Sequence, residues 1–62
     1  MKTIEISVTL TDEQALELAQ FLKRVCVSDY RARAANDEQA QAMLDAGEQL
    51  RRALAEHGYA PR

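Results

Sequence analysis

The residues with the most versatile chemistry in this 62-residue chain are one cysteine and one histidine, far apart in the sequence. Cys26 ends a series of apolar residues at helical spacing, which predicts a small buried hydrophobic side chain rather than a reactive thiol. His57 lies in the expected last turn of a helix, where a cationic ring interacts favourably with the helix dipole. No serine, histidine and carboxylate share a spacing typical of a catalytic triad. We therefore predict that the protein is not an enzyme.

Metal and cofactor sites are not indicated by the sequence either. A single cysteine and a single histidine are too few for a structural zinc site. The acidic residues stand mostly in the first turns of expected helices, where they interact with the helix dipole, so paired-carboxylate chemistry is not expected. The sequence predicts no metal, no cofactor and no catalytic residue.

Two groups of polar residues are candidates for binding another protein. The first is Ser28-Asp-Tyr-Arg, because tyrosine and arginine are enriched at interface hot spots. The alternative is that Tyr30 packs on the core and its charged neighbours are merely solvated. The second is an acidic helix face, which is either a mimic of DNA phosphates or an ordinary solvated surface. The residues predicted to contact a partner are Asp29, Tyr30, Arg31, Asp45, Glu48 and Arg52.

The elements that position these residues begin with an expected strand at about residues 3–10. Apolar residues alternate there with polar ones, at Ile4, Ile6, Val8 and Leu10. This period of two is typical of a half-buried strand. Because a lone strand cannot satisfy its own backbone groups, we expect it to pair with a second copy in a symmetric homodimer. The alternative partners are residues 25–28 and 59–62 of the same chain.

Two long helices are expected to start with the same signature. Thr11 and Asn36 each precede Asp-Glu-Gln-Ala, and each side chain can accept a hydrogen bond from the backbone N–H three residues later. The first helix continues to about Val25, and the second covers about residues 37–57. Gly58 is a natural residue to follow the second helix, and a short helical segment is predicted within residues 27–35.

Two details of the second helix carry structural predictions. Gly47 lies on its inner apolar stripe, and glycine within a helix costs about 1 kcal/mol relative to alanine. We expect another backbone to pass close to it. Glu48 and Arg52 form an i,i+4 pair in the favourable order.

Together these elements predict one α+β domain over residues 1–62, with β-α-α order. A core of this size supplies at most roughly 3–5 kcal/mol of net stability. The formal charge of −2 argues against a general nucleic-acid binder, so direct DNA binding is not expected. The sequence shows no long apolar run that would span a membrane and no signal peptide, so we expect a cytoplasmic protein.

The opening MKTIEISVTLTDEQ and the strand–helix–helix order resemble the ribbon-helix-helix repressors. In that family, strands paired across a dimer present their outward side chains to the major groove. The outward residues here include Glu5, a carboxylate that would face phosphates. The resemblance implies a dimer and, as the alternative function, a DNA-binding transcriptional regulator.

A second resemblance covers more of the chain. The runs Phe21-Leu-Lys-Arg-Val, Ser28-Asp-Tyr-Arg, Leu50-Arg-Arg-Ala-Leu and Gly58-Tyr-Ala-Pro-Arg look like a group of small proteins encoded by phages and prophages. The genes of that group often lie beside those of anti-CRISPR proteins. The resemblance implies a phage accessory role. Going one step beyond it, we predict an inhibitor of anti-CRISPR type that acts in the host cytoplasm and binds a bacterial protein or ribonucleoprotein defence complex. It would act by steric occlusion or by acidic mimicry of DNA.

Overall fold

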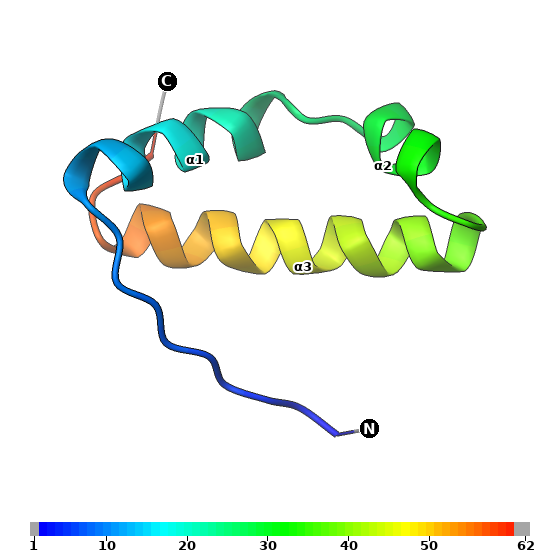
Figure 1. Ribbon diagram of the computed structural model, residues 1–62, viewed down its shortest axis with the longest axis horizontal. Helices are drawn as coiled ribbons and strands as arrows, with labels where there is room; N and C mark the ends of the chain where they lie inside the picture. Colours follow the sequence, from blue (N-terminus) through cyan, green and yellow to red (C-terminus); the bar gives the residue numbers. More distant parts are fainter. Residues whose placement is uncertain (1, 61–62) are drawn as a thin grey trace.

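The computed structural model describes residues 2–60, and this part of the chain contains three helices. They are α1 (Asp12–Arg24), α2 (Val27–Arg33) and α3 (Asp37–Glu56). α1 and α2 follow one another along one side, and α3 runs back beside both of them (Figure 1). The fold is an all-α helical hairpin whose first limb is broken between α1 and α2, with a short helix after the break as predicted.

The predicted α+β fold is wrong, because residues 2–10 form no strand in the described chain. This segment, here called the N-terminal arm, is extended and runs away from the start of α1 (Figure 1). None of its backbone groups is hydrogen-bonded to another part of residues 2–60. Alternating side chains favour an extended backbone, but a strand also needs a neighbouring backbone with which to pair. Residues 25–28 end one helix and start the next, and Tyr59 donates its N–H to Leu54, so within the described chain neither alternative supplies that neighbour. Residues 61–62 of the second alternative lie outside the described residues.

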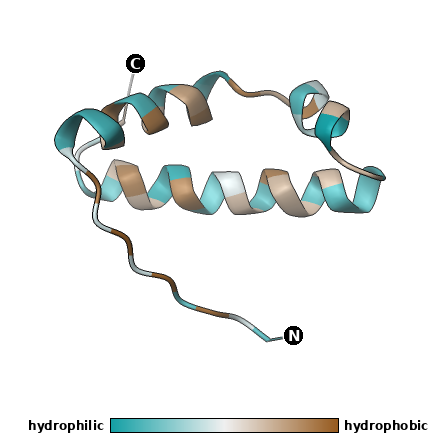
Figure 2. Ribbon diagram, in the orientation of Figure 1, coloured by the Kyte–Doolittle hydropathy of each residue, from teal (hydrophilic) through white to brown (hydrophobic). Residues whose placement is uncertain are grey.

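The apolar side chains of the arm lie in solvent. Figure 2 shows hydrophobic and hydrophilic residues alternating along it. Ile4, Ile6 and Val8 are 84%, 79% and 68% exposed. The prediction of a half-buried element is therefore wrong for a single chain, although the alternation behind it is real.

Both long helices start where the sequence predicted. The Thr11 hydroxyl accepts the Gln14 N–H at 3.0 Å, and the Gln14 side chain accepts the Thr11 N–H at 2.9 Å. The Asn36 side-chain oxygen accepts the Gln39 N–H at 2.8 Å. At the other end, Gly58 takes φ +96°, a left-handed conformation that suits glycine after a helix. The predicted caps are confirmed at all three positions.

Thr11→Ala and Asn36→Ala should each lower the free energy of unfolding by about 0.5–2 kcal/mol, because each leaves a helix N–H without its side-chain acceptor. Urea denaturation followed by circular dichroism measures the change. Thr9→Ala, on the exposed arm, is the control and should leave the midpoint unchanged. Midpoints equal to wild type in both cap variants would contradict the assigned helix starts.

The hydrophobic core is small because the hairpin is only one helix thick. The Cα positions span 34 × 28 × 15 Å, and a helix with its side chains is about 10–12 Å across. Ala19 is fully enclosed, with 0% exposure, so α1 and α3 approach closely at that point. Three of the five buried hydrophobic residues in the described chain are alanines, which bury little area; the five are Ala15, Ala19, Leu22, Ala40 and Leu54. Much of the apolar surface of the helices is therefore exposed in the single chain.

Candidate functional site

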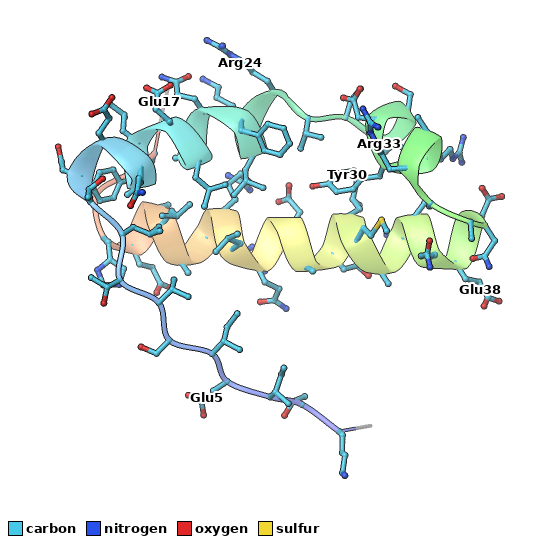
Figure 3. The ribbon with its side chains drawn as sticks, viewed as in Figure 1. Glu5, Glu17, Arg24, Tyr30, Arg33 and Glu38 are labelled. Atoms are coloured by element: carbon cyan, nitrogen blue, oxygen red, sulfur yellow. The ribbon has the colours of Figure 1, made fainter. Side chains whose placement is uncertain are left out.

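The side chains best placed to contact a partner lie where α1 meets α2. A groove of about 570 Å³ opens there. Phe21 of α1 lines it with 59% of its surface exposed. Arg24 follows from α1 and Arg33 from α2, and both are labelled in Figure 3. We call it the junction groove; its lining residues are Phe21, Arg24, Val25, Asp29, Tyr30, Ala32 and Arg33.

A two-residue break between the helices shapes this groove. Val25 and Cys26 are extended, with ψ of 135° and 172°. The Asp29 carboxylate restarts the helix by accepting the Cys26 backbone N–H at 2.9 Å and its thiol at 3.2 Å. Cys26 is exposed, so its predicted burial is wrong: α1 ends before the apolar stripe reaches it.

The hydrogen bonds to Asp29 lower its pKa below the ordinary 3.8 of an aspartate. The Cys26 backbone N–H has the largest effect, followed by the thiol, and the nearby Arg33 charge acts in the same direction. All three favour the ionised carboxylate. Asp29 therefore caps α2 as well as lining the junction groove.

Acid should loosen the start of α2. Because the pKa of Asp29 is lowered in the folded state, its stabilising contribution is present above the unfolded-state pKa and is lost as the pH falls through the folded-state pKa. In an NMR titration, the Cys26 amide proton should shift with a midpoint below 3.8. The Asp29→Asn variant should lose this transition. A midpoint at or above the ordinary aspartate value would contradict the capping role.

Tyr30 lies against α3. Its half-buried side chain points from α2 toward that helix (Figure 3). A Cβ built on Gly47 would collide with the Tyr30 hydroxyl and lie 3.3 Å from the ring carbon that carries it. Gly47 therefore makes room for a side chain, and the predicted close backbone is wrong. Arg31 projects from α2 and lies 3.7 Å from Asp37, in an exposed ion pair of little energetic weight.

The other predicted contact residues lie on α3 and do not line the junction groove. Asp45 accepts a hydrogen bond from the Gln41 side chain at 2.9 Å. Glu48 pairs with Arg51 at 2.8 Å, so the predicted pair with Arg52 is wrong. The Arg51 guanidinium lowers the pKa of Glu48, and Arg52 stays exposed. The structure thus brings Asp29 and Tyr30 together in one groove and leaves Asp45, Glu48 and Arg52 on another element.

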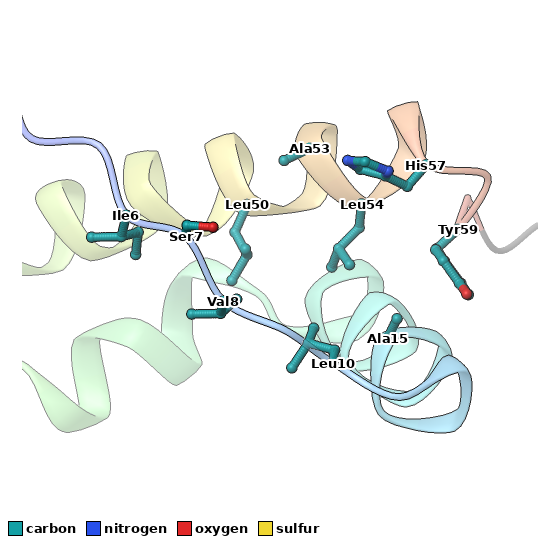
Figure 4. Close-up of a pocket in the computed structure, with 10 residues that line it drawn as sticks. All are labelled: Ile6, Ser7, Val8, Leu10, Ala15, Leu50, Ala53, Leu54, His57 and Tyr59. Atoms are coloured by element: carbon teal, nitrogen blue, oxygen red, sulfur yellow. The ribbon is translucent and has the colours of Figure 1, made fainter.

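A second groove, of about 420 Å³, lies between the N-terminal arm and the helices (Figure 4). His57 lines one part of it. This residue directly follows Glu56 as the C-cap of α3, which agrees with its predicted place at the helix end. The lining is apolar apart from a few polar groups, and it contains no lysine, arginine, aspartate or glutamate. We call it the arm groove; its residues are Ile6, Ser7, Val8, Leu10, Ala15, Leu50, Ala53, Leu54, His57 and Tyr59.

Neither groove has the side chains of a metal site. Among residues 2–60, no group of three histidine, cysteine or acidic side chains is placed to hold a metal ion. None of the three described helices has the length and apolarity needed to span a bilayer.

Several residues of the two grooves are not among the contact residues predicted from the sequence. By helical spacing, Phe21 widens the apolar stripe of α1 and Arg24 lies on the solvated face, so neither is singled out as a contact residue. The available signal was the width of that stripe, which exceeds what a single neighbouring helix covers. Tyr59 also packs against the core and donates a hydrogen bond to Asp12, which joins the end of α3 to the start of α1 and raises the Tyr59 pKa.

In their described residues, these features define a small helical-hairpin protein with an extended N-terminal arm and two open grooves. The whole chain, residues 1–62, matches the model of a family of unknown function, DUF7706, and it belongs to that family. No curated protein and no solved structure matches it.

Proposed function

We propose that this chain is a non-enzymatic protein-binding protein and that the junction groove is its contact surface. The observation that supports this is Phe21, a large aromatic side chain that is 59% exposed in a groove shared with two arginines. Aromatic and arginine side chains often carry most of the binding energy of an interface. An exposed phenylalanine contributes little to the fold, so a partner is the simplest reason for its position.

The charges of the junction groove define the chemistry of the partner. Arg24 and Arg33 are exposed on two different helices, and neither forms an ion pair within the described residues. The one carboxylate of the groove, on Asp29, is already hydrogen-bonded to Cys26. A segment that carries an apolar side chain beside a carboxylate fits this arrangement, since the apolar group covers Phe21 and the carboxylate accepts from an arginine.

The resemblance to small phage proteins supports a narrower form of the proposal. The partner is then a bacterial defence complex in the host cytoplasm, and binding inhibits it by steric occlusion, as anti-CRISPR proteins do. Acidic mimicry of DNA has less support, because Arg51 neutralises Glu48 and Arg31 lies near Asp37. Steric occlusion needs only the preformed groove.

Phe21→Ala should remove partner binding while the helices stay intact. A tagged chain captures its partner from a bacterial lysate, and the amount captured is compared among variants by mass spectrometry. Loss of a hot-spot side chain should weaken binding by roughly 30-fold or more. Leu16→Ala is the matched control, because Leu16 is an exposed apolar residue of the same helix outside the groove.

Three outcomes distinguish the candidate functions. Equal capture by Phe21→Ala and wild type would exclude the junction groove. A shift of duplex DNA that weakens steeply with salt would favour the DNA-binding regulator instead. If the partner is a CRISPR defence complex, the wild-type chain should restore phage plating on a host with active CRISPR immunity, and Phe21→Ala should not.

A further inference from the structure

The N-terminal arm and the arm groove form one apolar surface that the single chain leaves uncovered. Ile6 and Val8 of the arm line the groove together with Leu50 and Leu54 of α3. Ile6 and Val8 are 79% and 68% exposed even though they border it. The arm supplies one wall of the groove and nothing in the described chain fills it.

We infer that a second copy of this chain covers this surface, with the arm of each copy seated in the arm groove of the other. Such an exchange is two-fold symmetric and uses the same patch on both copies. The apolar side chains of each arm enter the groove. The polar residues Thr3, Glu5 and Thr9 lie outside the groove, and Ser7 is among the residues that line it.

The chemistry of the groove favours a second copy over an unrelated charged segment. The arm groove is lined by no lysine, arginine, aspartate or glutamate, so a charged segment would find none of these as a counter-charge there. The arm offers apolar side chains at every second position from Ile4 to Leu10, which is the complement that an apolar groove requires. The junction groove differs in this respect, because two arginines line it.

The need for burial also favours a second copy. Only five hydrophobic residues are buried within the described chain. A stable fold needs more apolar surface to be buried permanently, and a partner that binds only from time to time does not supply this. A second copy is the one partner always present. A standard interface covers about 800 Å² on each partner, which is about one seventh of the 5570 Å² that the chain exposes. Every residue of the arm, 2–10, is exposed and so is free to contribute to an interface of this kind.

The test measures mass in solution by sedimentation over a wide concentration range. Wild type should sediment as a dimer, with twice the 7.0 kDa mass of one chain. Val8→Glu places a carboxylate on the apolar side of the arm and should raise the dimer dissociation constant by roughly 100-fold. Thr9→Glu is the matched control: it adds the same charge one residue further on, outside the groove, and should leave the dimer intact.

A cross-linking measurement keeps the inference testable if Val8→Glu fails to fold. Ser7→Cys in a Cys26→Ser background should form a covalent dimer under mild oxidation, because the two arms lie close to one another across the two-fold axis. The wild-type chain, whose exposed Cys26 lies outside the arm groove, should not. A wild-type monomer at every concentration, or equal dimerisation of Val8→Glu and Thr9→Glu, would overturn the inference. Phe21→Ala should still dimerise, so this outcome is independent of the junction groove.

Discussion

Leu54→Ala should lower the free energy of unfolding by about 2–5 kcal/mol, the usual cost of truncating a buried leucine. Leu54 of α3 is buried together with Ala15, Ala19 and Leu22 of α1. It is the only large side chain that α3 contributes to this cluster within the described residues. Since a core of this size supplies at most roughly 3–5 kcal/mol of net stability, the variant should be mostly unfolded in dilute solution.

Far-ultraviolet circular dichroism and urea denaturation measure this loss. Leu16→Ala is the control, because Leu16 is 43% exposed on α1 and its truncation should cost about 0.5 kcal/mol. A Leu54→Ala variant with the same urea midpoint as Leu16→Ala would show that α1 and α3 do not pack as described.

The helices could be predicted from the sequence because their ends are set by local chemistry. Thr11 and Asn36 each accept a hydrogen bond from the amide three residues later, and Gly58 takes its left-handed conformation just after α3. Each of these contacts lies within a few residues of the chain. Local contacts of this kind can be recognised without knowledge of the tertiary structure.

The error at the N-terminal arm has a different physical origin. Alternation from Ile4 to Leu10 describes which side of the backbone is apolar, and that description is correct. A strand is defined by hydrogen bonds to a second backbone, and no backbone of the described chain is hydrogen-bonded to the arm. The pattern could therefore predict an extended segment but not its partner.

Errors at single side chains arose where two local solutions have similar energies. Glu48 can reach a cation three or four residues later, and it pairs with Arg51 rather than Arg52. A different error concerns Cys26, which lies two residues past the end of α1, so its periodicity with the apolar stripe does not bury it. The candidate site was only partly predictable: of the six predicted contact residues, Asp29 and Tyr30 line the junction groove, and their contact with a partner stays a prediction, whereas Phe21 was not among the six.

The effect of Gly47→Ala on the free energy of unfolding should depend on the side chain at position 30. With Tyr30 present, the new methyl group meets the phenol hydroxyl, and overpacking of this kind costs about 1–3 kcal/mol. The gain in helix propensity offsets about 1 kcal/mol of that cost. In a Tyr30→Phe background the hydroxyl is absent, and the nearest ring carbon, at 3.3 Å, needs only a small shift. There Gly47→Ala should be neutral or stabilising.

A double-mutant cycle built from urea denaturation measures the coupling, which should be about 1–3 kcal/mol. Ala46→Gly, at the exposed neighbouring position of α3, gives the propensity difference without the contact. Equal effects of Gly47→Ala in both backgrounds would place the Tyr30 ring away from α3 in solution. Strong coupling instead means that Gly47 fixes the ring, and with it the orientation of α2. The junction groove is then a preformed surface, which lowers the conformational cost of binding a partner.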